Sequence, residues 1–279
     1  RDGVVMAWDM QSGACTRTLP AFDVLAHCAT VAGDSILHGC DDGMIRVRKL
    51  SDGARVREYV GHEDRVTSVW TTKTHLCSGS FDDSVRVFNL DTGECQHTLY
   101  EHEARVSAVN GMERQPEVFW SGGDDERVRV WDLETGACIR TFEGHTAEVT
   151  VLCPIAPNIM ISGSADRTAL AWDSRRDGSI SRIQPNADRI TAMCMVANGV
   201  LALGTGSKPV TFWNLQAGAA HSRLPEQGHH SDWVTSLCGY TGAFLFTGGA
   251  DRAVKLWDWA RGGRLRELQP AHKDWVVHM

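Results

Sequence analysis

Twelve histidines and many aspartates give this chain the residue types needed for general acid–base chemistry. These residues recur at a regular period, whereas a catalytic constellation would break the period and occur once. Three histidines outside the period, His75, His97 and His221, have no pattern of partner residues around them. No nucleophile-elbow, HExxH or phosphate-loop motif is present. We therefore predict no catalytic residue, no enzymatic activity and no cofactor.

The nine cysteines are the other candidates for chemistry. Cys15, Cys95 and Cys138 each begin a predicted strand after a turn, and others fall in apolar runs. No CxxC pair and no zinc-type Cys/His spacing occurs. We interpret the cysteines as buried, reduced thiols that behave as small hydrophobic residues, and we predict no metal site. Reduced thiols are typical of a cytoplasmic protein, with the nucleus as a further possibility.

The elements that position these residues follow from a repeat. Four short strand-like runs end in Trp-Asp, at Val4–Asp9, Arg127–Asp132, Thr168–Asp173 and Ala253–Asp258, and three weaker runs lie between them. The marker positions are Trp8, Arg48, Phe88, Trp131, Trp172, Trp213 and Trp257. Successive markers are 40 to 44 residues apart. This period predicts an all-β repeat protein built of four-stranded propeller blades.

One repeat shows the expected strands. Alternating apolar residues predict strands at 105–109, 118–121, 127–132 and 137–142, with Pro116 in the first connecting segment. The turn at 122–125 is rich in Gly and Asp, which tolerate positive φ or bond their own backbone. The next unit then begins at 143–145.

These motifs resemble the WD-repeat family of β-propellers, and the resemblance covers essentially the whole chain. The Gly-His element of that family occurs at Gly61-His62, Gly144-His145 and Gly228-His229. The resemblance implies a hydrogen-bonded structural network of His, Ser or Thr, Asp and Trp in each blade. The matching sets are His102, Ser121, Asp125 and Trp131; His145, Ser162, Asp166 and Trp172; and His230 or His229 with Thr247, Asp251 and Trp257.

Three units depart from this pattern. Phe88 and Arg48 replace the network Trp, and the sixth unit has Asn186 and Ser207 where His and Asp are expected. We predict that these blades depend on packing and strand pairing, and that they are softer than the others.

The two ends of the chain predict a seventh, incomplete blade. Residues 1–19 supply a third and a fourth strand, residues 273–279 supply a first strand, and no second strand is present. The expected fold is a single seven-bladed domain over residues 1–279, with one blade shared between the termini. We expect this domain to be part of a longer protein, and a parent with eight blades is the alternative.

The net charge of −7 and the isoelectric point near 5.9 argue against a general affinity for nucleic acid or anionic membranes. We predict neither as a partner. No apolar run is long enough to span a bilayer.

Binding residues are expected where the repeat varies. In propellers of this type, the residues just before the first strand and just before the turn Asp lie near the rim of the upper face. The predicted contact residues at these positions are Trp233, Trp275, Arg65, Arg105, Arg189 and Phe81. Trp and Arg are enriched at interaction hot spots, and Arg recognises carboxylate and phosphate bidentately. We predict a non-catalytic scaffold for a protein or peptide, with an acidic or phosphorylated segment as the candidate partner. The competing interpretation is that the tryptophans pack as core and the arginines pair with neighbouring acids.

A second candidate site is the string Trp172-Asp173-Ser174-Arg175. It resembles the WDxR box of substrate receptors in cullin-type ubiquitin ligases, although Arg167 and Ala171 depart from the usual pattern. The alternative function is therefore a ligase adaptor that uses Asp173 and Arg175.

Overall fold

The computed structural model describes residues 4–9, 12–19, 24–112, 114–184, 188–197, 199–206, 209–225, 228–268 and 272–276. They form strands β1 to β26, grouped in six four-stranded antiparallel sheets and one two-stranded sheet. This confirms the predicted all-β fold of four-stranded blades. Within the described ranges, no helix is long and apolar enough to cross a membrane. Asn186 and Ser207, which the sequence marked as departures, lie outside the described residues.

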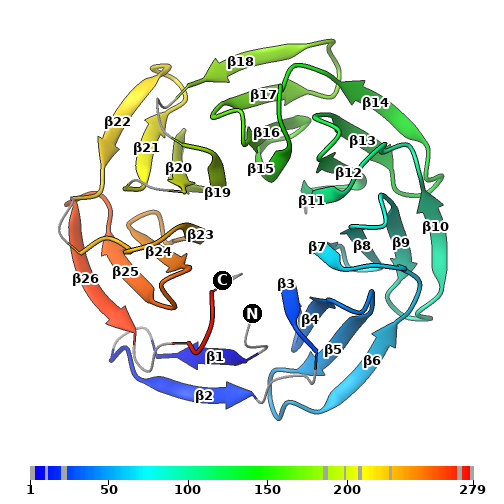
Figure 1. Cartoon of the computed structure of the whole chain (residues 1–279), viewed down its shortest axis with the longest axis horizontal. Helices are drawn as coiled ribbons and strands as arrows, with labels where there is room; N and C mark the ends of the chain where they lie inside the picture. The colour runs from blue at the N-terminus through cyan, green and yellow to red at the C-terminus, as the bar shows by residue number, and fades with distance from the viewer. Residues whose placement is uncertain are drawn as a thin grey trace. The chain divides into compact units, whose positions relative to one another are not determined.

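The chain divides into two compact units, and the larger one spans Val24–Arg182. Its four blades are consecutive runs of four strands, with the first strands of neighbouring blades in contact (Figure 1). The strands are β3 (Ala26–Ala32), β4 (Ser35–Cys40), β5 (Ile45–Lys49), β6 (Arg55–Tyr59), β7 (Val66–Thr71), β8 (His75–Ser80), β9 (Val85–Asn89), β10 (Cys95–Leu99), β11 (Val106–Met112), β12 (Gln115–Gly123), β13 (Val128–Asp132), β14 (Cys138–Phe142), β15 (Val149–Ala156), β16 (Ile159–Ser164), β17 (Ala169–Asp173) and β18 (Ser179–Ile183).

The second unit combines Arg1–Asp23 with Ile183–Met279. It holds two complete blades and a two-stranded sheet. The complete blades are β19 (Ile190–Ala197), β20 (Val200–Thr205), β21 (Thr211–Asn214) and β22 (Ala219–Arg223), followed by β23 (Val234–Tyr240), β24 (Phe244–Gly249), β25 (Val254–Asp258) and β26 (Gly263–Leu268). The two-stranded sheet is β1 (Val5–Trp8) paired with β2 (Cys15–Leu19).

The seventh blade is assembled from both ends of the chain, as predicted. The Thr191 hydroxyl in β19 donates to the carbonyl of Val234, the first residue of the first strand of the next blade. The Thr235 hydroxyl in β23 donates in the same way to the carbonyl of Val276. Val276 therefore occupies a first-strand position. The ring of His272 lies 5.7 Å from that of Trp8 in a T-shaped contact, which joins the C-terminal segment to β1.

In four of the six complete blades the core is built around a buried marker aromatic, whereas the marker Trp213 of another is half-buried. Trp131 and Trp172 are fully buried, and Trp257 is 1% exposed. Phe88 fills the same position with its ring 5.4 Å from that of Tyr59. Arg48, the other substitution, is also buried. The greater softness of the departing blades stays a prediction.

The cysteine interpretation was partly wrong. All nine thiols are free, but only three are buried, Cys95 is exposed and the other five are half-buried. At Cys95 and Cys138 the reason is a bulge at the start of the fourth strand, which turns this position toward Thr98 or Thr141 three residues on. Cys77 is buried as expected, and desolvation raises the pKa of its thiol.

Candidate functional site

Each complete blade has one edge where its first strand begins and its second strand ends, called here the entry edge. Arg65 directly precedes β7, Phe81 directly follows β8, and the Phe81 amide donates to the Arg65 carbonyl over 2.9 Å. Arg105 has the equivalent position before β11 in the next blade. The pairing of β7 with β8 thus places Arg65 beside Phe81, 16 positions later in the chain. The neighbouring blade adds Arg105 as the third residue.

Arg65, Phe81 and Arg105 form a cation–π cluster in the larger unit. The guanidinium carbon of Arg65 lies 5.0 Å from the centroid of the Phe81 ring, and that of Arg105 lies 4.5 Å from it. Contacts of this kind are worth about 0.5–1 kcal/mol at exposed sites. The structure therefore brings together three of the six predicted contact residues.

The two arginines of this cluster differ in their carboxylate partners. Arg65 Nε lies 2.5 Å from Asp41 Oδ1, and this hydrogen bond is the main reason that the pKa of Asp41 is held below its usual range. Arg105 Nε is 4.0 Å from Asp124, and the Arg105 side chain is 55% exposed. Pairing with neighbouring acids, the competing interpretation, thus describes Arg65 better than Arg105.

The smaller unit holds the other three predicted residues. Trp233 is 41% exposed, and the guanidinium carbon of Arg189 lies 5.6 Å from its ring. Asp232 and Asp274 accept the backbone amides of Trp233 and Trp275 over 2.8 and 2.7 Å. Trp275 itself is half-buried. The half-buried Arg189 and the exposed Trp233 therefore form a second cation–π pair, and Trp275 is less exposed than Trp233.

The second candidate site, around Asp173, is an internal ion pair at the opposite edge. Arg175 Nε and Nη2 lie 2.8 and 2.7 Å from the two carboxylate oxygens of Asp173. Asp173 is buried and the Arg175 side chain is 62% exposed. The hydrogen bond from Arg175 is the main cause that holds the pKa of Asp173 below its usual range. Arg140 Nε donates to the Ser174 carbonyl over 3.0 Å and fixes the turn.

The periodic His, Ser and Asp residues form the expected networks. Trp131 Nε1 donates to Ser121 Oγ over 2.7 Å, and Ser121 Oγ is 2.7 Å from His102 Nε2. His102 Nδ1 lies 3.0 Å from Asp125. A neutral imidazole protonated at Nδ1 satisfies this chain of donors, with Ser121 donating to Nε2.

The other two networks have the same geometry. In one, Ser162 Oγ is 2.6 Å from His145 Nε2 and 2.7 Å from Trp172 Nε1. In the smaller unit, His230 rather than His229 takes the network position, with Nε2 2.7 Å from Thr247 Oγ1 and Nδ1 2.7 Å from Asp251. Trp257 Nε1 completes that set over 2.9 Å.

Burial and hydrogen bonding set the charges of these networks. Burial would raise the pKa of Asp125, but hydrogen bonds from His102 and Arg129 outweigh it and hold the carboxylate ionised. Burial lowers the pKa of His102, and Asp125 offsets this only in part. A neutral His bonded to an ionised Asp is a framework element, because each member is already satisfied.

Two basic residues that belong to these networks were not predicted from the sequence. Arg129 Nη1 lies 2.6 Å from Asp125, and Lys255 Nζ donates to the His229 carbonyl over 2.6 Å. Both side chains are buried, and both stand two residues before the blade Trp. That shared spacing was the signal available in the sequence.

A second missed feature is a bond between successive blades of the larger unit. Arg57 donates to the Leu90 carbonyl over 2.9 Å, and His97 Nε2 lies 2.9 Å from the Glu134 carbonyl. Arg140 makes the equivalent bond to the turn after β17. His97, which lacked a partner pattern in the sequence, thus has a structural role.

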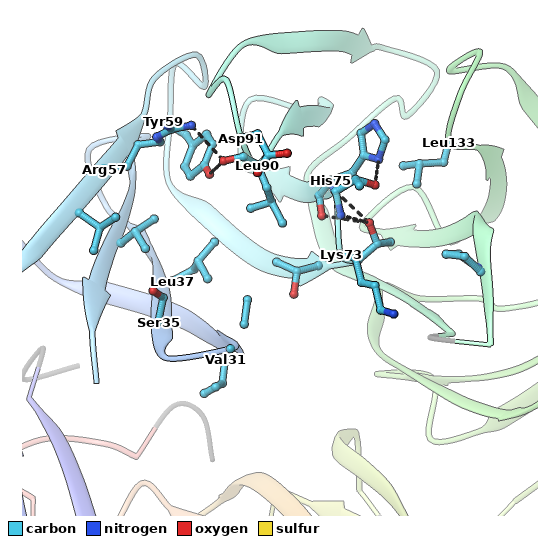
Figure 2. A pocket seen from close by; sticks show the side chains of 18 of the residues that line it. Val31, Ser35, Leu37, Arg57, Tyr59, Lys73, His75, Leu90, Asp91 and Leu133 are labelled. Atoms are coloured by element: carbon cyan, nitrogen blue, oxygen red, sulfur yellow. Dashed lines mark hydrogen bonds between the residues drawn. The ribbon is translucent and has the colours of Figure 1, made fainter. Parts of the chain in front are cut away.

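A cavity of about 1160 Å³ opens in the larger unit at the edge opposite the entry edge. Figure 2 shows its wall, where side chains of three blades converge. Its lining includes Val31, Leu37, Tyr59, Lys73, His75, Leu90, Asp91 and Leu133. None of the predicted contact residues lines it. In the described part of the chain, no group of three or more His, Cys, Asp or Glu side chains is arranged to hold a metal ion.

Comparison with known proteins gives the family context. The chain is 29% identical over 102 residues to an uncharacterized WD repeat-containing protein of Schizosaccharomyces pombe, covering 36% of this chain and 28% of that protein. It is 30% identical over 101 residues to Autophagy-related protein 16 of Arabidopsis thaliana, covering 35% and 20%. It is 26% identical over 120 residues to Nuclear distribution protein PAC1 of Zygosaccharomyces rouxii, covering 42% and 26%.

The chain spans less than a third of the length of each of these relatives. The model of the WD domain, G-beta repeat, matches residues 53–89, 93–132, 136–173 and 222–258, more than half of the chain. Each of the first three segments covers the fourth strand of one blade and the first three strands of the next blade. The chain belongs to the WD domain, G-beta repeat family of β-propeller repeats.

Proposed function

We propose that this chain is a non-catalytic scaffold that binds a protein or peptide at its entry edges. WD-repeat propellers generally serve as protein-interaction scaffolds, and the finer assignment depends on one observation. Guanidinium groups lie over aromatic rings at the entry edge in both units, over the half-buried Phe81 and over the exposed Trp233. An aromatic ring with an overlying cation offers apolar area and charge at low entropic cost.

The proposed partner presents an acidic or phosphorylated segment. Arg105 is the residue best suited to it, since its side chain is more than half exposed and its nearest carboxylate is 4.0 Å away. An incoming carboxylate or phosphate could take two N–H donors of this guanidinium. Arg65 is already engaged with Asp41 and would position the Phe81 ring.

The test replaces Trp233 or Arg105 with Ala and measures partner recovery by pull-down and affinity. Each substitution is expected to weaken binding by at least tenfold, in line with hot-spot residues. Tyr240→Ala is the matched control for Trp233, because Tyr240 is 47% exposed at the far end of β23, the strand that Trp233 directly precedes. Arg261→Ala, an 88% exposed guanidinium, is the control for Arg105. Unchanged recovery with both entry-edge variants would remove the proposal.

A second candidate function, an adaptor of a cullin-type ubiquitin ligase, is supported by the geometry at Asp173. The Asp173–Arg175 pair presents a fixed, exposed guanidinium on a turn held by Arg140. Arg175→Ala should abolish co-purification of a cullin complex, whereas Arg176→Ala should not, although the neighbouring Arg176 side chain is even more exposed, at 73% against 62%. Failure to recover a cullin complex with the unmutated protein would dismiss this function.

We also propose a cytoplasmic location, with the nucleus as the alternative. Nine free thiols support it, because cysteines in oxidising compartments usually pair. Localisation of the tagged full-length protein by microscopy tests it, and a secreted protein would contradict it.

A further inference from the structure

The cavity opposite the entry edge has an apolar floor that extends over three blades of the larger unit (Figure 2). Leu90 follows the third strand of one blade and Leu133 the third strand of the next, so one repeat position lines the cavity twice. Val31 and Val56 also line it, and they are 58% and 50% exposed. Exposed apolar groups around a concave surface mark interaction sites.

Charged side chains without ion-pair partners lie on two sides of this floor. Lys73 and Arg114 belong to hairpins between first and second strands, whereas Asp91 and Glu134 belong to turns between third and fourth strands. All four are exposed, and none forms an ion pair with another residue that the structure describes. Figure 2 shows Lys73 and Asp91 on opposite sides of Leu90. The cavity thus has a cationic side near the first strands and an anionic side near the fourth strands.

The other polar groups of the wall are engaged or lie between these two sides. The Leu90 carbonyl accepts hydrogen bonds from Arg57 over 2.9 Å and from the Tyr59 hydroxyl over 3.2 Å. His75 Nδ1 lies 2.9 Å from the hydroxyl of the preceding residue. Glu117, on the second strand β12, adds an exposed carboxylate. The four charged side chains of the two sides therefore remain available to a partner.

The backbone of the wall favours a partner that satisfies its own hydrogen bonds. The Leu90 amide donates to the Thr74 carbonyl over 2.8 Å, and the Leu133 amide donates to the Glu117 carbonyl over 2.8 Å. An extended peptide needs free backbone groups for strand addition, whereas a helix pairs its backbone internally. A helix 10–12 Å across occupies about 400–600 Å³ per turn. The cavity of about 1160 Å³ thus corresponds to roughly two to three turns.

We propose that this cavity binds an amphipathic helix of a partner protein. The apolar stripe of the helix packs on the floor of the cavity, acidic residues on one side of the stripe face Lys73 and Arg114, and basic residues on the other side face Asp91 and Glu134. The apolar contacts supply most of the affinity, and the two charged sides orient the helix. None of the predicted entry-edge residues lines this cavity, so the chain has a second binding site at the opposite edge.

The test uses three labelled helices of about 16 residues with a common stripe of Leu at i, i+3, i+4 and i+7. The mixed helix carries Glu on one side of the stripe and Lys on the other, the second carries Lys on both sides, and the third carries Glu on both sides. Fluorescence anisotropy at physiological salt measures their binding to the unmutated chain. We expect the mixed helix to bind at least about tenfold more tightly than either of the others.

Two variants separate the floor from the charges. Val31→Asp places a charge on the floor and should weaken binding of the mixed helix at least about tenfold. Val60→Asp is its matched control, because Val60 is 64% exposed and follows β6 at the entry edge of the same blade. Lys73→Glu combined with Arg114→Glu makes both sides anionic, so this variant should bind the helix with Lys on both sides more tightly than the mixed helix. Both residues are exposed in hairpins, where substitutions change stability little.

Three results would overturn the proposal: no binding of the mixed helix to the unmutated chain, equal binding of the three helices, or equal effects of Val31→Asp and Val60→Asp. Trp233→Ala and Arg105→Ala should leave helix binding unchanged, which keeps this test separate from that of the entry edges. Weaker helix binding by these two variants would place the helix at the entry edge and would also overturn the proposal.

Discussion

The hydroxyl of Ser162 gives the sharpest test of the blade network. It is fully buried and lies 2.6 Å from His145 Nε2 and 2.7 Å from Trp172 Nε1. Ser162→Ala leaves both nitrogens buried and unsatisfied. At about 1–3 kcal/mol for each orphaned group, the free energy of unfolding should fall by about 2–6 kcal/mol.

The chain supplies its own control at Ser78. This hydroxyl is equally buried and lies 2.7 Å from His62 Nε2, but the Trp of its blade is replaced by Phe88, which has no N–H. Ser78→Ala therefore orphans one nitrogen instead of two. The expected loss is about 1–3 kcal/mol, roughly half that of Ser162→Ala.

Equilibrium urea unfolding followed by far-UV circular dichroism measures both losses. The two sites lie in the same compact unit, so the comparison reports on one structural region. A further variant, Trp172→Phe, makes the second blade resemble the first. On that background Ser162→Ala should cost only as much as Ser78→Ala. An equal or larger loss for Ser78→Ala in the unmutated chain would refute the hydrogen-bond argument.

Three other predictions concern the charge of a network histidine, a bond between blades and a close approach of two strands. Burial lowers the pKa of His145 below its ordinary 6.5, so the folded state binds fewer protons than the unfolded state; the urea midpoint should be maximal above pH 6.5 and fall on acidification below it, and a rise would contradict this sign. Arg140→Met removes the bond to the turn after β17 and should speed hydrogen exchange at residues 174–178, without the same effect in the other turns of the larger unit. Gly122→Ala should destabilise by about 1–3 kcal/mol because its Cβ meets Val149, whereas Gly263→Ala, with open space around it, should be near neutral; equal effects of the two would show that the close approach does not matter.

Strand positions were largely predictable from local pattern, with errors at the hairpin ends. The second strand predicted at 118–121 runs over Gln115–Gly123, and Pro116, expected in the connection, lies inside it. Its register explains the tolerance. The pairing with β13 begins at Val118 and Asp132, so Pro116 lies beyond the end of the third strand and its missing N–H costs no ladder bond there.

The residues of the candidate site could be predicted from the sequence, but their ion-pair partners could not. Repeat position alone selected Phe81, Arg65 and Arg105, and the structure places both guanidinium carbons within 5.0 Å of the Phe81 ring centroid. It could not separate Arg65, tied to Asp41, from the more exposed Arg105. Ion pairs form between residues 24 positions apart on different blades, and no local pattern encodes that distance.

The sequence by itself determined the structure of the single blade. The same alternation of apolar residues, the same turns and the same His, Ser or Thr, Asp and Trp residues recur every 40 to 44 residues, and these features depend only on residues close together in the sequence. The tertiary structure decided how the residues that depart from the repeat are accommodated. It shows which histidine joins a network and that the two ends of the chain share one blade. Those outcomes depend on contacts between segments remote in sequence, and only the packed chain brings such segments together.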